Sequence, residues 1–159
     1  MQSNDVNAAA VNGKEAAYFG VPWEDAYGYA QAIKVGDTIH VSCQLSHDET
    51  GNLIAPASLD ESGKPAEFSM MEQQTRATYA NQAFGALRGN AGQRRRGDAV
   101  CPRCRPAFAA AGKVHKEAYG TARPQCASCL IGVARLAFPE QLIEITFKAV
   151  LSGAEAKPR

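Results

Sequence analysis

Residues 142–150 constrain the fold of this chain more strongly than any other segment. Apolar side chains occupy every second position there, and this period of two residues is typical of a β-strand that buries one face. The buried set is Ile143, Ile145, Phe147 and Ala149, and the opposite set is Leu142, Glu144, Thr146 and Lys148. Glu144 is exceptional, because a carboxylate between apolar neighbours must meet solvent or find a partner.

Three further segments have the length and composition of strands. Residues 130–136 form an apolar run that a short proline-containing link separates from the strand above. Residues 27–33 and 38–45 flank a Gly-Asp pair, which predicts a tight turn and therefore an antiparallel hairpin. Another turn is expected at residues 48–52, where the glycine can adopt a positive φ.

The first of two expected helices begins near Ser69. Ser69 and Glu72 have the spacing of a capping box, in which each side chain satisfies a free backbone N–H at the start of a helix. The apolar residues that follow at helical spacing are assigned to the core. They are Met70, Ala77, Ala80, Phe84 and Leu87.

A second helix fits residues 106–119. Proline is favourable in the first turn of a helix and glycine just beyond its last turn, and Pro106 and Gly120 occupy these positions. His115 lies near the end of this helix, where positive charge is favourable, so no catalytic role is assigned to it.

The 159 residues are enough for one domain with a buried core. Residues 1–17 are small, polar and without periodicity, so they are expected to be a mobile tail before a single domain of residues 18–159. A formal net charge of +1 gives no general attraction to nucleic acid or membranes. With neither a signal peptide nor an apolar run of about 20 residues, a cytoplasmic location with reduced cysteines is expected.

Three ordered landmarks resemble the RidA family, also called the YjgF or endoribonuclease L-PSP family, some members of which are named translation initiation inhibitors. Tyr29-Ala-Gln-Ala resembles the family's YSQA motif, and Val41-Ser-Cys-Gln followed by Glu49-Thr-Gly resembles its VSGQ and ETG motifs. Val133-Ala-Arg-Leu, a proline-containing link and Leu142-Ile-Glu-Ile resemble its C-terminal signature. The resemblance covers roughly residues 27–81 and 106–150.

The resemblance implies an α+β, chorismate-mutase-like fold: a mostly antiparallel sheet with two helices on one face, assembled as a homotrimer with sites between subunits. Enzymes of this family hydrolyse enamines and imines to keto acids and ammonia, and no cofactor or metal is implied. The expected partners are therefore a small-molecule substrate and two further copies of the chain. A sheet covered on one side leaves a face that self-association could bury.

The site residues follow from the same resemblance. Glu144 matches the glutamate that positions or activates the attacking water, and Tyr29 matches a tyrosine that lines the cleft. Cys43 replaces a glycine at which the backbone approaches the ligand, so its side chain should narrow the pocket. Ser128 replaces the arginine that binds the substrate carboxylate, and Cys129 replaces a small polar residue. The loss of this arginine leaves an imino acid without an evident anchor, because the guanidinium fork is what selects a carboxylate.

Residues 82–105 depart from the family pattern. The part from Gly89 to Arg105 contains five arginines and shows no alternation, so it is not expected to pair inside a sheet. Reading ordinary codons for this segment one base later can spell Phe-Gly-Ala-Thr-Leu-Asp-Asn-Val-Val-Glu-Glu-Thr-Leu-Tyr-Val-Leu-Asp-Val-Asp. That sequence is a helix end, a turn and a strand, so a pair of compensating frameshifts, in the gene or in its sequencing, is the favoured interpretation.

Two alternative functions stay open beside the hydrolase. A noncatalytic binder of small ligands would use the same trimer. The other is a nucleic-acid-binding or ribonuclease protein: Cys101-Pro-Arg-Cys104 and Cys126-Ala-Ser-Cys129, separated by 21 residues, have nearly the spacing of a four-cysteine zinc site, and three arginines precede them. Against zinc, the second pair leads into an expected strand, and the nearly neutral charge weighs against nucleic acid.

Overall fold

The computed structural model describes residues 9–11, 13–81 and 94–151. Its strands are β1 (Ala9–Val11), β2 (Lys14–Ala17), β3 (Ala32–Val35), β4 (Thr38–Gln44), β5 (Arg94–Cys101), β6 (Leu130–Gly132) and β7 (Glu144–Val150). Its helices are α1 (Pro22–Tyr27), α2 (Met71–Ala80) and α4 (Cys104–Tyr119). None of the helices in the described ranges is long and apolar enough to cross a membrane.

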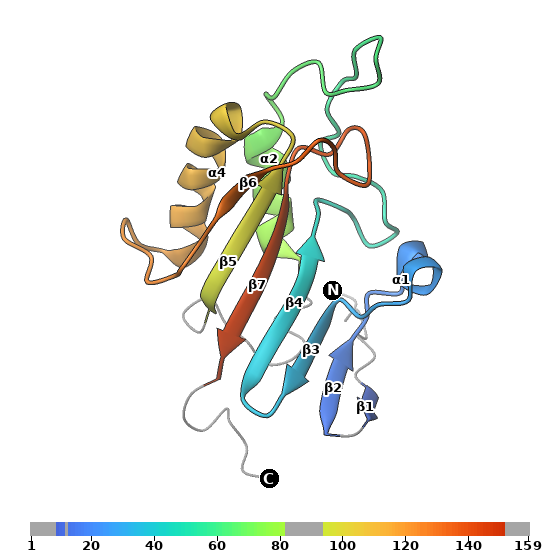
Figure 1. The fold of residues 1–159 in the computed structure, drawn as a ribbon, viewed down its shortest axis with the longest axis vertical. Coiled ribbons are helices and arrows are strands. Elements are labelled where there is room, and N and C mark those ends of the chain that lie inside the picture. Colours follow the sequence, from blue (N-terminus) through green and yellow to red (C-terminus); the bar gives the residue numbers. More distant parts are fainter. Residues whose placement is uncertain (1–8, 12, 82–93, 152–159) are drawn as a thin grey trace.

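The seven strands form one sheet in the order β1-β2-β3-β4-β7-β5-β6. Helices α2 and α4 lie side by side on one face of it (Figure 1). The predicted α+β architecture is thus confirmed, with one refinement. Strands β5 and β6 pair in parallel, because α4 connects them as a crossover, whereas the other pairs are antiparallel.

The central hairpin and β7 follow the sequence pattern. Strands β3 and β4 pair as the predicted antiparallel hairpin, and β4 pairs with β7. Along β7 the side chains of Ile145, Phe147 and Ala149 are buried against the helices, as the alternation predicts. The strand begins at Glu144, two residues later than expected, although Leu142 and Ile143 before it are fully buried.

The other C-terminal strand is much shorter than predicted. Residues 130–136 were expected to form a strand, but β6 ends at Gly132. The reason is its partner: β5 ends at Cys101, opposite Gly132, and Pro102 follows, which has no N–H to continue the ladder.

The N-terminal part differs from the prediction in two places. Residues 14–17 do not belong to a tail, because Lys14–Ala17 is strand β2, paired with β3, and Ala17 is fully buried. Residues 27–31 are not strand either, because helix α1 ends at Tyr27 and Gly28 closes it with φ +78°. The Glu24 carboxylate in α1 accepts hydrogen bonds from the backbone N–H groups of Phe19 and Gly20, both at 2.8 Å. These bonds hold the helix against the preceding loop, and the strand pattern gave no sign of them.

Helix α2 buries a different face from the one predicted. Its N-cap residue, Met70, makes no side-chain hydrogen bond to the helix. The Ser69 backbone N–H instead donates to the Glu67 carboxylate, so the expected capping box is absent. The buried residues are Met71, Gln74, Thr75 and Thr78, whereas Ala80 is exposed. Phe84 and Leu87 of the predicted stripe lie outside the described residues.

A polar face is buried because its groups find partners. The Gln74 amide donates to the carbonyls of Ala55 and Glu140, at 2.9 and 3.0 Å, and accepts the N–H of Leu142 at 2.8 Å. The Thr75 and Thr78 hydroxyls donate to carbonyls one turn earlier in the helix. These bonds join α2 to two loops that are remote in the sequence, so the amphipathic pattern of the helix alone could not identify this face.

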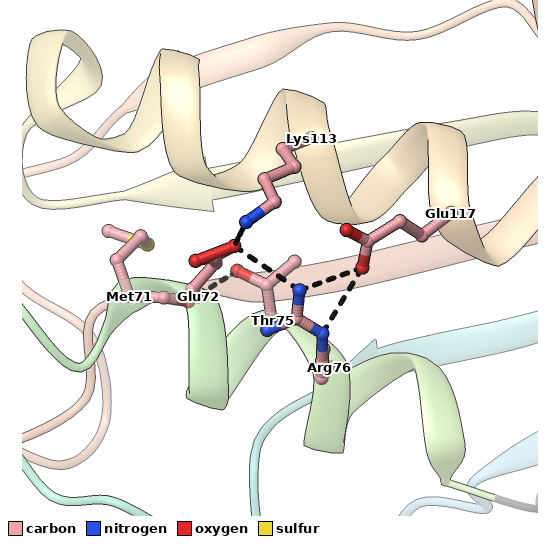
Figure 2. Close-up of polar contacts among 6 residues, drawn as sticks. All are labelled: Met71, Glu72, Thr75, Arg76, Lys113 and Glu117. Atoms are coloured by element: carbon pink, nitrogen blue, oxygen red, sulfur yellow. Dashed lines mark hydrogen bonds and ion pairs between the residues drawn. The ribbon is translucent and has the colours of Figure 1, made fainter. Parts of the chain in front are cut away.

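Ion pairs join α2 to α4. Arg76 contacts Glu117 of α4 at 2.8 Å and Glu72 of its own helix at 3.2 Å, and Lys113 of α4 also contacts Glu72 (Figure 2). The hydrogen bond from Lys113 is the main cause that holds the pKa of Glu72 below its usual value. Helix α4 begins two residues earlier than predicted and ends as predicted, with Gly120 at φ +65°.

The arginine-rich segment corrects the prediction most strongly. Residues expected not to pair in a sheet form β5, which lies between β7 and β6. The register shifts between Arg94 and Arg96, as at a β-bulge. Neighbours on both sides supply the hydrogen bonds of the ladder, and the exposed Arg96 side chain pairs with Asp98 at 2.6 Å on the face away from the helices.

Candidate functional site

Glu144 begins β7 on the face of the sheet that the helices leave uncovered. Strand alternation determines this direction, because Ile143 and Ile145 on either side are buried towards the helices. Its pairing partner in β5 is Val100, so the two share this open face. Glu144 is half-buried and belongs to the middle of the sheet, where its carboxylate is held on a rigid element.

The negative charge of Glu144 raises the pKa of two predicted site residues, Tyr29 and Cys43. Burial raises the pKa of Tyr29, and Glu144 contributes to the same direction. Protein atoms around Cys43 raise its pKa by desolvation, although the residue is exposed at the surface of this single chain, and Glu144 raises it further. Because Glu144 raises the pKa of both groups within one chain, the three side chains lie near one another in a single copy.

The position of Cys43 depends on an irregularity in β4. The pairing of β4 with β7 shifts between Val41 and Gln44, so Ser42 and Cys43 lie in a bulge-like segment. The Thr146 hydroxyl of β7 donates to the carbonyl of Val41 at 2.6 Å and fixes the strand where the shift begins. Bulges redirect side chains near functional sites, and here the effect is to place Cys43 near Glu144.

A pair of buried amides supports Tyr29. Gln44 donates to the Gln31 side chain at 2.9 Å, and Gln31 donates to the Tyr29 phenol at 3.2 Å. Both glutamines are 2% exposed, so this chain of hydrogen bonds is shielded from water. These glutamines are not among the site residues predicted from the sequence. A signal was present, because each belongs to one of the landmarks that also supply Tyr29 and Cys43.

Ser128 and Cys129 lie elsewhere, at the edge of the sheet. They precede β6, the last strand in the sheet, and β5 separates β6 from β7. Two strand spacings amount to about 10 Å, so Glu144 is not in contact with either residue of its own chain. The Cys129 sulfur accepts a hydrogen bond from the Arg96 guanidinium at 3.6 Å, and the Cys129 backbone N–H donates one to the Asp98 carboxylate at 2.8 Å.

Ser128 lines a cavity of about 450 Å³ between α4 and the sheet. Small residues of β5, Gly97 and Ala99, form one wall, and residues of α4 form the other. His115 is also in this wall, with its Nδ1 atom 2.7 Å from the Tyr79 hydroxyl. Ser128 therefore lies on the helix side of the sheet, opposite the face that carries Glu144.

A second hollow is a groove of about 720 Å³ between residues 60–68 and residues 133–139. Arg135 of the Val-Ala-Arg-Leu motif is exposed there, and Arg103 lies over the ring of Phe68 at 5.9 Å. The groove does not include any of the predicted site residues.

The cysteines do not form the four-thiolate arrangement that their spacing suggests. Cys101 and Cys104 lie together, with their sulfur atoms 3.7 Å apart. Cys126 instead meets the hydroxyl of Tyr119 at 2.9 Å, and Cys129 meets Arg96. Within the described residues no three His, Cys, Asp or Glu side chains are grouped closely enough to hold a metal ion.

No protein-family model and no curated protein sequence matches the chain. Solved structures do. A member of the YjgF/YER057c/UK114 family from Mycobacterium tuberculosis is 21% identical, with 87% of this chain and 99% of that chain covered and a TM-score of 0.64. For RidA from the Antarctic bacterium Psychrobacter sp. PAMC 21119 the identity is 20%, the coverage 95% and 98%, and the TM-score 0.62.

Protein YJGH gives a TM-score of 0.67 at 20% identity, over 89% of this chain and 98% of that chain. At these identities the comparisons establish the fold. The chain therefore has the fold of the YjgF/RidA family, as the three landmarks in its sequence predict.

Proposed function

We propose that this chain is a RidA-like small-molecule hydrolase that converts an enamine or imine to a carbonyl compound and ammonia. The observation that carries the proposal is that Glu144, on the open face of the sheet, raises the pKa of both Tyr29 and Cys43, so the three side chains lie near one another. A carboxylate and a phenol in one half-buried cluster are the groups that this reaction needs, one to take a proton and one to donate a hydrogen bond.

Glu144 would act on water. Its carboxylate accepts a proton while the water oxygen bonds to the imine carbon, and the electron pair of the C=N bond moves to nitrogen, which takes up a proton. A further proton transfer to nitrogen, from the new hydroxyl group, lets the C–N bond break, releasing ammonia and leaving the carbonyl. Because burial raises the pKa of Tyr29, its phenol stays protonated at neutral pH and can hold the substrate.

Cys43 is assigned a space-filling role in this site. Its raised pKa keeps the thiol protonated at neutral pH, and a thiol is a far weaker nucleophile than a thiolate. Its side chain occupies the corner next to Glu144 and would restrict the size of the substrate.

The complete site is proposed to form between subunits of a homotrimer. Ser128 and Cys129 lie at the edge of the sheet, while Glu144 lies in its middle, and strand β5 separates them within one chain. Because Ser128 and Cys129 are exposed at this edge, a neighbouring chain that docks its edge on the open face could bring both residues to Glu144. The same docking would bury the side of the sheet that α2 and α4 leave uncovered.

The test follows the conversion of 2-iminobutanoate to 2-oxobutanoate by the purified protein. Little turnover is expected from the unmodified chain, because Ser128 cannot pair with the substrate carboxylate. Ser128→Arg should raise turnover, and Glu144→Gln added to it should remove the gain. Glu140→Gln is the matched control, since this carboxylate lies outside the cluster and its loss should leave turnover unchanged.

The outcomes separate the hydrolase from its alternatives. Strong activity of the unmodified chain would show that another group anchors the substrate and that the assignment of Ser128 is wrong. A Ser128→Arg trimer that binds 2-oxobutanoate without any turnover would favour the noncatalytic binder. A monomer in size-exclusion chromatography with light scattering would contradict the shared site.

A further inference from the structure

We propose that Cys101 and Cys104 form a redox-active dithiol that closes reversibly to an intrachain disulfide. The two sulfur atoms lie 3.7 Å apart at the junction where β5 ends and α4 begins. Cys101 follows Val100, the pairing partner of Glu144, but it belongs to the core on the helix side of the sheet, and the proposal does not depend on the hydrolase function.

The junction brings the two sulfur atoms close enough to be joined. Cys101 is the last residue of β5 and Cys104 the first residue of α4, and the turn through Pro102 and Arg103 places their sulfur atoms next to each other. An S–S bond is about 2.05 Å long, so rotation about the Cα–Cβ bonds must bring the sulfur atoms closer by less than 2 Å.

Gly132 of the neighbouring strand leaves room for the pair. A Cβ atom at this position would lie only 3.1 Å from the sulfur of Cys104, a distance tighter than ordinary van der Waals contact. The glycine therefore allows the Cys104 thiol to lie against β6 and to rotate. This explains why a residue without a side chain follows the apolar pair at the end of β6.

The two thiols have different surroundings and hence different roles. Cys101 is fully buried, and its S–H donates to the sulfur of Cys104. Desolvation, together with that hydrogen bond, raises the pKa of Cys101 to about 12, so it stays protonated. Cys104 is half-buried, so its sulfur is the one that an oxidant can reach. Cys104 is therefore the attacking sulfur and Cys101 the resolving one.

A hydroperoxide is the oxidant that fits these roles. The Cys104 thiolate attacks one peroxide oxygen, the O–O bond breaks, and the leaving hydroxide or alkoxide takes a proton, which leaves Cys104 as a sulfenic acid. Cys101 then loses its proton and attacks the Cys104 sulfur, and the sulfenic oxygen leaves as water. In total, two thiols and one hydroperoxide give one disulfide, one alcohol or water, and one further water.

The remaining cysteines have other neighbours. Cys126 contacts Tyr119, Cys129 contacts Arg96, and Cys43 lies on the open face near Glu144. The disulfide should therefore form at one position and without scrambling.

Peptide mapping tests the proposal on the full-length protein. The protein is treated with hydrogen peroxide, its remaining thiols are blocked with iodoacetamide, and it is digested with trypsin. Trypsin cleaves after Arg103 and does not cleave between Arg105 and Pro106, so the cysteines fall in separate peptides, residues 97–103 and 104–113. We expect the two peptides to appear linked, or as one uncut peptide 2 Da lighter than its reduced form, and dithiothreitol should restore both thiols.

Variants distinguish the two roles. Cys101→Ser should leave Cys104 as a sulfenic acid that dimedone labels, whereas Cys104→Ser should abolish both the disulfide and the label. Cys126→Ser with Cys129→Ser is the matched control and should retain the disulfide. The proposal is overturned if both peptides are recovered with blocked thiols after peroxide, if the link joins other cysteines, or if no peptide containing Cys101 is found.

Discussion

Strands β7 and β5 are neighbours in one sheet and beneath the same helices, yet they fill the space under those helices differently. On the helix side β7 presents Ile145 and Phe147, which are 2% and 5% exposed. The β5 residues paired directly opposite them are Ala99 and Gly97, and a cavity of about 450 Å³ lies between these two and α4. Ile145 of β7 also borders this cavity, which extends over the small residues of β5.

The difference shows that a strand can be specified in two ways. The alternation within β7 determines which of its faces is buried and therefore its register. The printed sequence of β5 has no such pattern, and hydrogen bonds from β7 on one side and β6 on the other determine its place. A strand held in this way tolerates small and charged residues, at the cost of poorly filled interior volume.

The first prediction concerns the amino-acid sequence of β5, because a different sequence there would replace every side chain of the strand. We expect mass spectrometry of the purified protein to find the printed tryptic peptide of residues 97–103. A peptide matching the shifted reading frame, which is rich in Leu and Val, would show a sequencing error. The large apolar side chains of that alternative sequence would fill the interior under α4 and remove the contrast with β7. Cys101 and Cys104 would then be absent, which would overturn the dithiol proposal.

The second prediction compares side-chain deletions in the two strands. Ile145→Ala should lower the free energy of unfolding by about 2–5 kcal/mol, because it removes a buried side chain and enlarges the cavity that this side chain borders. Val100→Ala in β5 removes a half-buried side chain from the open face and should cost about 1 kcal/mol or less. Urea unfolding measures both. Equal losses would show that Val100 is as tightly packed as Ile145 and would contradict the difference between the two strands.

The third prediction adds side-chain volume to each strand. Ala99→Leu extends into the cavity under α4 and should raise the free energy of unfolding by about 1–2 kcal/mol. Ala149→Leu makes the same change in β7, at a position that is fully buried and outside this cavity, and should lower it by about 1–3 kcal/mol. Effects of the same sign would show that the two strands are equally well packed.

The smallest effect is expected in the helix layer that covers both strands. Glu72→Gln removes the ion pairs with Arg76 and Lys113 and should lower stability slightly at neutral pH. The folded protein holds the pKa of Glu72 below its ordinary value of 4.5, so its contribution is present above that value and is lost as the pH falls further. Urea unfolding at pH 7 and pH 3 should show the difference between the two proteins shrinking, and a constant difference would contradict the ion-pair explanation.

The candidate site was predictable only in part. The family resemblance suggested Tyr29, Cys43 and Glu144, and alternation along β7 gave the direction of Glu144. That Glu144 lies near the other two residues in a single copy depends on the register shift in β4 and on the order of strands in the sheet. Gln31 and Gln44 belong to the same landmarks, but only the folded chain shows that they pair with each other and support Tyr29.

The sequence by itself determined the features that repeat locally: the alternation of β7, the β3–β4 hairpin, the end of α4 at Gly120 and the landmarks of the family fold. The tertiary structure decided the place of β5, the polar buried face of α2 and the pairing of Cys101 with Cys104. These depend on partners far away in the chain, as when Gln74 bonds to the backbone of Ala55, Glu140 and Leu142. A local pattern records which face of an element is apolar, but only the folded chain shows which polar groups find partners and can be buried.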